Sequence, residues 1–307
     1  LRERGKMQLK GLTNEQVVQR FLNQRAGESK NLTSGVAPHL ATPNEHLGGS
    51  LYSYATLIAT WRRGALWGNA DTFSITTSSH QALLRYHARL PRGDRAPVTL
   101  HLVPFSALVR FNLSLDSLYV LEDLPEFWTC KEHAEPGFPS ACSCPTAVHH
   151  LGGLLFRAFD RHFLAAWDRL DRGNFFVTEL VAPAQSVEEA YQVLKPPEVV
   201  LAEVQRIGVL RQGDIFCIPR PLPDGLSLPV SWGSIWGTSH VATRVRAGAG
   251  EVYVQGTIRH RPLDTRPEHR MLVLPGQGWY LAVPNTSTTT GLVSGRAMSY
   301  SFGGRVD

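Results

Sequence analysis

Lysine is scarce in this chain of 307 residues: it occurs at five positions, although Lys and Arg together number 31 and the formal net charge is +5. Nearly all the positive charge is therefore carried by arginine, whose planar guanidinium binds phosphate or carboxylate through paired hydrogen bonds and stacks on bases. This bias favours a nucleic-acid or phosphate partner. A GC-rich genome would produce the same bias without any functional meaning, and both explanations stay open at this point.

Long apolar runs and a cysteine framework are also missing. No stretch approaches the ~18 uninterrupted apolar residues that indicate a membrane-spanning helix. The charged segment 1–6 precedes Met7, a candidate start, and no apolar segment typical of a signal peptide follows it. Four cysteines are too few for the disulfide framework of a small secreted domain. We therefore expect a cytoplasmic protein with no membrane partner.

Several common enzyme motifs are absent. The sequence contains no phosphate-binding Gly-x-x-x-x-Gly-Lys-Ser/Thr loop and no Gly-x-Gly-x-x-Gly after a strand. It also lacks the Gly-x-Ser-x-Gly elbow and the His-Glu-x-x-His pair. These absences count against nucleotide hydrolases, dinucleotide enzymes, common serine hydrolases and zinc proteases of that type.

Hydrophobic spacing in the first part of the chain predicts helices alternating with strands. Thr13 and Gln16 form a capping box that starts a helix at about 13–24, and the polar segment 25–50 is expected to be a loop. A second capping box, Ser78 with Gln81, starts another helix. Strands are expected over four apolar or β-branched segments, 51–61, 65–67, 72–77 and 98–105.

Further along, helical spacing gives way to short β segments. Apolar residues from Leu151 to Trp167 recur at helical spacing and predict a helix over about 147–170. A strand is expected at 175–180, then a helix from a third capping box, Ser186 with Glu189, that the proline pair at 196–197 ends. From residue 208 onward, short apolar runs bounded by Gly and Pro predict strands at 209–210, 213–219, 240–246, 252–259, 271–274 and 279–283.

These elements define an α+β fold, with an N-terminal mixed α/β part followed by a β-rich C-terminal part that forms a small barrel or a curved sheet. The expected domains are 1–206, which contains a Cys/His loop at 122–147, and the β-rich 207–284. A flexible Ser-, Thr- and Gly-rich tail, or docking arm, follows at 285–307.

The Cys/His loop has the ligands of a structural metal site. Cys130 and His133, followed by Cys142 and Cys144, supply four soft or borderline ligands, which is the number that a tetrahedral zinc ion binds. A loop with so little apolar content would gain its order from the metal. We expect one structural zinc here. The alternative is a set of unrelated thiols, since this spacing differs from that of standard zinc fingers.

A basic hairpin near the C-terminus is the candidate binding surface. With a turn at 247–250, Arg244 and Arg246 leave the same face of one strand, and the returning strand ends in Arg259 and Arg261. The aromatic residues close to them in the sequence are Trp232, Trp236, Tyr253 and Trp279. Arginines interleaved with aromatic residues are typical of surfaces that follow a phosphate backbone and stack bases, so we expect DNA or RNA as the partner.

Histidines accompany these arginines. His240 is expected on the same strand face as the first two arginines, and His260 and His269 follow in the returning segment. Two histidines could act as general base and general acid in a metal-free ribonuclease. These three are the candidate catalytic residues, and whether the protein is an enzyme stays open. The alternative is a solvated basic face whose histidines only cap strands.

Two segments resemble known proteins of unassigned activity. Leu51–Ala59 (LYSYATLIA) and Phe73–Gln81 (FSITTSSHQ) resemble the start of an uncharacterised protein family of phages and mobile elements. A third segment, His240–Val245, is faintly similar to parts of other uncharacterised bacterial proteins. The resemblance implies a setting and supplies no catalytic residues.

Three functions are therefore compared. The first is a nucleic-acid-associated protein of a phage or mobile element that binds through the Arg-rich hairpin. The second is a nuclease that uses His and Arg residues of the C-terminal region. The third is a structural or assembly component of a virus-like particle, which the Ser/Thr/Gly tail and the β content would suit.

Overall fold

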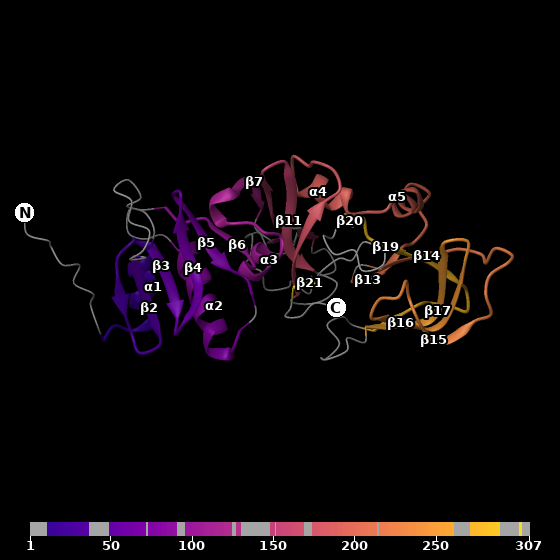
Figure 1. Ribbon diagram of the computed structural model, residues 1–307, viewed down its shortest axis with the longest axis horizontal. Coiled ribbons are helices and arrows are strands. Elements are labelled where there is room, and N and C mark those ends of the chain that lie inside the picture. Colours follow the sequence, from indigo (N-terminus) through magenta and orange to yellow (C-terminus); the bar gives the residue numbers. More distant parts are fainter. Residues whose placement is uncertain are drawn as a thin grey trace, which may run out of the picture. The chain divides into compact units, whose positions relative to one another are not determined.

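The computed structural model describes residues 11–36, 49–71, 73–90, 96–124, 127–129, 148–150, 152–168, 174–213, 215–260, 271–288 and 301–302. The chain divides into two compact units, Leu1–Leu118 and Tyr119–Asp307 (Figure 1). The expected α+β class is confirmed, with helices and strands mixed in the N-terminal part and sheets dominating the C-terminal part. The domain boundary predicted between 206 and 207 falls inside the second unit, where it separates two sheets.

A six-stranded sheet, the N-terminal sheet, forms the first unit. Its strands follow chain order, with antiparallel pairing from β1 to β5 and parallel pairing between β5 and β6. The parallel pair is possible because a helix, α2, crosses between its two strands. The strands are β1 (Gly27–Glu28), β2 (Leu32–Val36), β3 (Gly49–Ser53), β4 (Thr56–Arg62), β5 (Ala65–Asn69) and β6 (Leu100–Val103).

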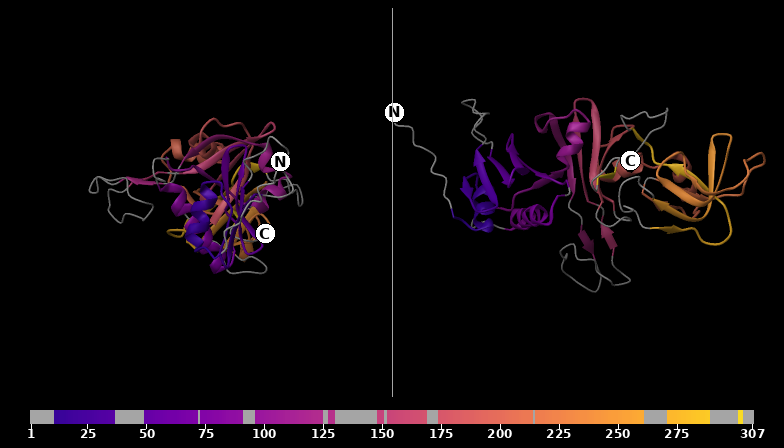
Figure 2. Two further views of the ribbon diagram at one scale, coloured as in Figure 1. Left: turned by 90° about the vertical axis from the view of Figure 1, so that its left-hand side faces the viewer. Right: turned by 60° about the horizontal axis from the view of Figure 1, so that its bottom comes forward.

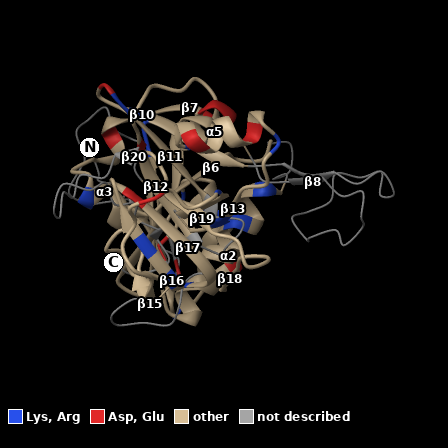
Figure 3. Ribbon diagram, turned by 90° about the vertical axis from the view of Figure 1, so that its right-hand side faces the viewer, with Lys and Arg blue, Asp and Glu red and all other residues tan. Residues whose placement is uncertain are grey.

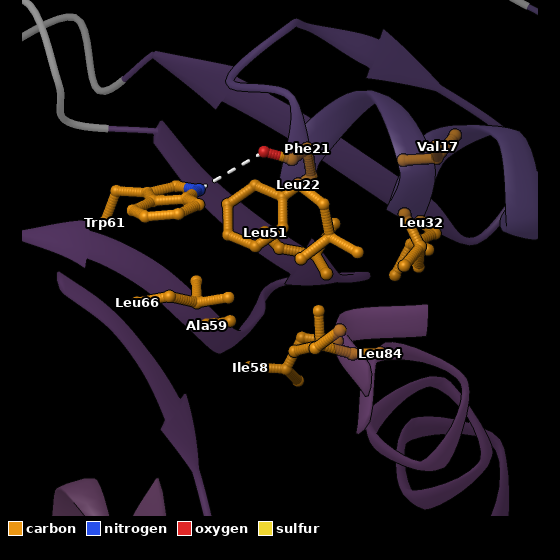
Figure 4. Close-up of a cluster of buried hydrophobic side chains, with 12 residues drawn as sticks. Val17, Phe21, Leu22, Leu32, Leu51, Ile58, Ala59, Trp61, Leu66 and Leu84 are labelled. Atoms are coloured by element: carbon orange, nitrogen blue, oxygen red, sulfur yellow. Dashed lines mark hydrogen bonds between the residues drawn. The ribbon is translucent and has the colours of Figure 1, made fainter. Parts of the chain in front are cut away.

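Two helices, α1 (Asn14–Leu22) and α2 (Ile75–Arg89), pack on this sheet and enclose its core (Figure 2). Apolar side chains from both helices meet those of β2 to β5, as Figure 4 shows, and the indole nitrogen of Trp61 donates to the Phe21 carbonyl at 3.2 Å. The capping box of Thr13 with Gln16 is confirmed, because each side chain accepts from the other residue's backbone N–H. A short helix, α3 (Phe105–Arg110), follows β6.

Four sequence predictions for this unit are wrong. The segment 25–50, expected as a loop, contains β1, β2 and the start of β3. The segment 51–61 is a hairpin, because Tyr54 adopts a left-handed backbone (φ +52°) that ends β3. Helix α2 begins at Ile75, so 72–77 is not a strand, and its N-cap is Ser74, whose hydroxyl accepts from the Thr77 N–H. The expected box with Gln81 does not form because that side chain donates to backbone carbonyls at 69 and 71.

The second unit begins with another antiparallel sheet, the middle sheet. Its path is β20–β12–β11–β10–β7, and β21 also pairs with β12. Helix α4 (Val187–Val193) packs its buried side chains against β10, β11 and β12. The strands are β7 (Leu118–Leu124), β10 (Gly153–Ala158), β11 (Arg161–Asp168), β12 (Asn174–Leu180), β20 (Ser287–Thr288) and β21 (Ser301–Phe302), so parts of the expected tail dock onto β12.

The helix predicted over 147–170 is wrong: β10 and β11 form a hairpin there. Phe159, with φ +58°, and Asp160 make the turn, and Phe156 pairs with Phe163 across the strands with ring centroids 5.2 Å apart. Both faces of β10 are buried, so its apolar residues form a run without alternation. Such a run matches helical spacing by coincidence, and only pairing with a partner strand distinguishes the two structures.

Helix α5 (Pro197–Val204) also departs from expectation. The proline pair at 196–197 was expected only to end the preceding helix, yet Pro197 is the first residue of a new one. Proline suits that position, since the first N–H groups of a helix have no partner within it. Helix α5 packs on the last sheet through Val199 and Ala202.

The last sheet, the C-terminal sheet, has the order β13–β14–β19–β17–β16–β15, with β18 also on β17. Among the described residues this path does not close into a barrel. One face carries a core cluster that includes Ile215, Val254 and Ala282, and the other packs against α5. The strands are β13 (Leu210–Gln212), β14 (Ile215–Pro219), β15 (Val230–Ser234), β16 (His240–Gly248), β17 (Glu251–His260), β18 (Leu272–Val273) and β19 (Tyr280–Pro284).

Two shorter strands, β8 (Phe127–Thr129) and β9 (Val148–His150), pair with each other. Among the residues that the structure describes, no helix has the length and apolar character needed to cross a membrane.

Candidate nucleic-acid interface

The hairpin of β16 and β17 carries the predicted basic residues. Its turn consists of Ala249 and Gly250, both with positive φ (51° and 80°), and Gly248 pairs with Glu251. Two consecutive positive φ values are the mark of the tight turn that fits the right-handed twist of paired strands. The hairpin is therefore as predicted, with a turn shorter than 247–250.

A bulge divides this hairpin. Ala242 pairs with Ile258 and Arg244 with Gln255, so two residues of β17 lie opposite Thr243 alone. One of these two is Gly256, whose φ of +87° favours glycine and whose Cβ, if present, would lie 2.9 Å from the Thr243 Cβ. A bulge with glycine in this conformation bends the strand and re-aims side chains.

The bulge changes which residues face the core. His240 and Ala242 point to the core before it and Val245 points there after it, while Arg244 is exposed. The expectation that His240 shares a face with Arg244 and Arg246 is therefore wrong. Strict two-residue alternation holds only for an uninterrupted strand.

Two arginines stack on tryptophans on the face opposite the core cluster. The Arg244 guanidinium lies 5.8 Å from the Trp279 ring centroid, and its Nη1 donates to Gln255 Oε1 at 3.1 Å. The Arg259 guanidinium lies 4.7 Å from the ring centroid of Trp232. Both distances fall within the range of cation–π contact. We call these five residues the arginine face.

Within the described residues, no acidic side chain neutralises the positive charge of the arginine face. Neither Arg244 nor Arg259 forms an ion pair within the described part of the chain, whereas Arg220, directly after β14, pairs with Glu251 at 3.2 Å. The described residues of 210–284 include five arginines against two acidic residues. Figure 3, a view from the side of this sheet, marks such basic positions in blue. Exposed guanidinium groups of this kind have the charge and the hydrogen-bond donors that suit an anion.

The other two predicted binding residues, Arg246 and Arg261, are not part of the arginine face. Arg246 is half-buried, and its Nε donates to the Ser227 carbonyl at 2.7 Å, so this guanidinium helps to hold the 227 segment against β16. Arg261 lies outside the described residues.

The candidate catalytic histidines of the hairpin are interior residues. His240 and His260 pair across the two strands with ring centroids 4.7 Å apart, and they are 3% and 1% exposed. His260 Nε2 bonds to Ser239 Oγ at 2.7 Å, and His240 Nδ1 lies 3.3 Å from Thr238 Oγ1. A substrate on the arginine face would not contact these rings. His269 lies outside the described residues.

The predicted zinc ligands, Cys130, His133, Cys142 and Cys144, also lie outside the described residues, so the zinc site stays a prediction. Within the described residues no group of three or more His, Cys, Asp or Glu side chains could hold a metal. The remaining cysteine, Cys217, is buried in the C-terminal core, and burial raises the pKa of its thiol to about 12. At neutral pH it stays protonated and is not a nucleophile.

Sequence reasoning missed a buried polar network in the first unit. Ser29 Oγ donates to Asn14 Oδ1 at 2.6 Å, so the Asn14 amide nitrogen, 3.0 Å from His80 Nε2, is the donor there. His80 therefore carries its proton on Nδ1, which lies 2.8 Å from Ser53 Oγ. The Ser53 hydroxyl in turn contacts Thr77 Oγ1 at 3.1 Å.

This arrangement is structural. Activation of a serine needs a histidine nitrogen that accepts the hydroxyl proton, and here the facing nitrogen is already the donor. Ser53 is also fully buried. The network joins segments that are far apart in the sequence, since Ser53 and His80 are 27 residues apart and Asn14 and His80 are 66 apart. No local pattern in the sequence indicates it.

Comparisons with protein-family models, with curated proteins and with solved structures found no match to this chain.

Proposed function

We propose that this protein binds nucleic acid through the arginine face of its C-terminal sheet. The observation that carries the proposal is the pair of Arg–Trp contacts, Arg244 with Trp279 and Arg259 with Trp232, on the sheet face that also packs against α5. Both guanidinium groups are exposed, and neither forms an ion pair within the described residues. The resemblance of two segments to proteins of phages and mobile elements supplies the proposed biological setting.

The physical basis is the combination of charge and ring surface. Each arginine that contacts a phosphate releases a condensed counterion from the nucleic acid. This release increases the affinity of the protein for the nucleic acid whatever the base sequence. A tryptophan beside the arginine offers a surface on which a base or a second guanidinium can stack. Holding a guanidinium over a ring also reduces the side-chain entropy that is lost on binding. A nuclease is less well supported, because the hairpin histidines are buried.

The test is a salt series of binding to a fluorescent mixed-sequence oligonucleotide. The double variant Arg244→Ala/Arg259→Ala should weaken binding similarly for all sequences. It should also lower the magnitude of the slope of log K against log salt by about 1.4 to 1.8, because two phosphate contacts are lost. Circular dichroism should show an unchanged fold, since both positions are exposed.

The matched control is Arg63→Ala/Arg89→Ala, which removes two exposed positive charges from the first unit. It should leave the salt slope unchanged. The proposal fails if the parent protein binds no oligonucleotide at low salt, or if the control variant weakens binding as much as the arginine-face variant.

A further inference from the structure

We infer that the nucleic acid held by the arginine face is single-stranded and is gripped by base stacking at two points; this inference rests on the proposed function. The two Arg–Trp pairs are separate platforms. Arg244 contacts Gln255 at one end of a β17 segment, and Arg259 lies at its other end. Each pair brings one flat, exposed guanidinium group to the surface, over a ring that is exposed in Trp232 and half-buried in Trp279.

The spacing of the platforms sets the length of ligand that they can share. Trp279 directly precedes β19 and Trp232 lies in β15, three strands away in the order β19–β17–β16–β15, so at about 4.8 Å between neighbouring strands the two platforms lie about 14 Å apart. Successive nucleotides of a stacked strand rise by about 3.4 Å. A strand that reaches both platforms therefore spans about four nucleotides.

The backbone at Trp232 supports a stacking role. Its φ is +50°, a conformation that bulky side chains rarely adopt, and it lies in the edge strand β15 with the side chain 39% exposed. Such strain concentrates at functional positions. Trp236, which also has positive φ (54°), instead donates its indole N–H to the Ala282 carbonyl at 2.9 Å.

A duplex would use this surface poorly. Its bases are stacked on one another, so only groove edges and phosphates are available to the protein. Duplex readers insert a helix or a two-stranded ribbon into a groove, whereas β16 and β17 lie between neighbours on both sides in the sheet. Of the described arginines on β16 and β17, only Arg244 and Arg259 are exposed, so this part of the face offers little further positive charge for a second strand of phosphates.

The experiment measures dissociation constants of the full chain for oligothymidylates of two, four, six and eight nucleotides, and for a 16-base-pair duplex, at one salt concentration. We expect the single strand of eight to bind at least ten-fold tighter than the duplex. We also expect a steep gain in affinity between two and four to six nucleotides, with quenching of tryptophan fluorescence. Trp232→Ala should weaken binding of the eight-nucleotide strand by about ten-fold, because a lost stacked base has an effect of that order.

Two variants make this result interpretable. Trp232→Tyr keeps a stacking ring and should stay within about three-fold of the parent, which excludes misfolding as the cause of the alanine effect. Tyr119→Ala removes the ring of another Arg–aromatic pair, with Arg157 5.4 Å from the ring centroid in the middle sheet, and should change nothing. Equal affinity for duplex and single strand, or no effect of Trp232→Ala, would overturn this inference while leaving the proposed function standing. Absence of any binding would end both.

Discussion

The polar side chains considered in the first unit are buried, whereas those considered in the C-terminal sheet are exposed to solvent. In the first unit, Asn14 and Ser53 both bond to the ring of His80 within the protein. In the C-terminal sheet, Arg244 and Arg259 lie exposed over tryptophan rings. The buried groups gain from satisfied hydrogen bonds, whereas the exposed ones keep their charge available to a ligand.

This difference predicts separate consequences of mutation. Changes in the network should alter stability and leave ligand affinity intact, because its members are already bonded to each other. Changes on the arginine face should alter affinity and leave stability intact, because exposed side chains contribute little to the folding free energy. The following variants test that separation, from the largest expected effect to the smallest.

Phe21→Ala should have the largest effect. The ring is buried between α1 and the N-terminal sheet, so truncation should lower the free energy of unfolding of the first unit by about 3 to 5 kcal/mol. Oligonucleotide affinity should stay unchanged wherever the C-terminal sheet remains folded. Urea unfolding followed by circular dichroism, alongside binding, measures both quantities. Ile75→Ala, at an 88% exposed position of α2, is the control and should be nearly neutral. A large loss of oligonucleotide affinity in the Phe21 variant would show that stability of the first unit and ligand binding are not independent.

Gly256→Ala should couple the two properties, because the bulge at Gly256 lies between the platforms. The new Cβ would lie 2.9 Å from the Thr243 Cβ at a φ of +87°, so we expect a loss of about 2 to 3 kcal/mol and weaker oligonucleotide binding. Gly250→Ala has a similar φ, +80°, but open space around its Cβ, and should lose only about 1 kcal/mol. Thermal melting compares the stability of the two variants. Equal losses of stability would show that the close contact of the new Cβ with Thr243 does not destabilise the fold.

His80 should make the first unit sensitive to acid. Burial lowers the pKa of His80 below its ordinary value of 6.5. Between the folded and unfolded pKa values the unfolded state binds more protons, so stability is complete above about pH 6.5 and falls as the pH drops below it. Urea unfolding at pH 7.5 and pH 5.5 measures this fall.

His80→Gln is the matched variant. At pH 7.5 it should lose about 1 to 3 kcal/mol, because buried partners of the ring lose hydrogen bonds. Its stability should also depend less on pH than that of the parent. An identical pH dependence in both proteins would show that another group controls the acid response.

Arg246→Ala should have the smallest effect. Its guanidinium is directed to the Ser227 carbonyl, so we expect less than a twofold change in oligonucleotide affinity and a stability change of about 0.5 kcal/mol. Arg244→Ala measured in parallel should weaken binding clearly more. If both variants lose affinity equally, the bound strand extends beyond the arginine face toward the hairpin turn.

Local patterns in the sequence determined the features whose cause lies within a few residues. The capping box of Thr13 with Gln16 formed because its donors and acceptors are three residues apart. Most of the C-terminal strands formed where Gly and Pro bound short apolar runs, and the paired glycines near 250 predicted the hairpin. The scarcity of lysine likewise pointed to arginine as the charged group of any binding surface.

Tertiary structure decided the features that depend on residues far apart in the sequence. The apolar run at 153–158 became a strand because a partner strand was available, and its spacing alone fits a helix equally well. The bulge at Gly256 turned His240 inward, and the contact of Arg244 with Trp279 joins residues that are remote in sequence. A local pattern constrains only neighbouring residues, whereas strand register and side-chain facing depend on free energies that the folded chain alone supplies.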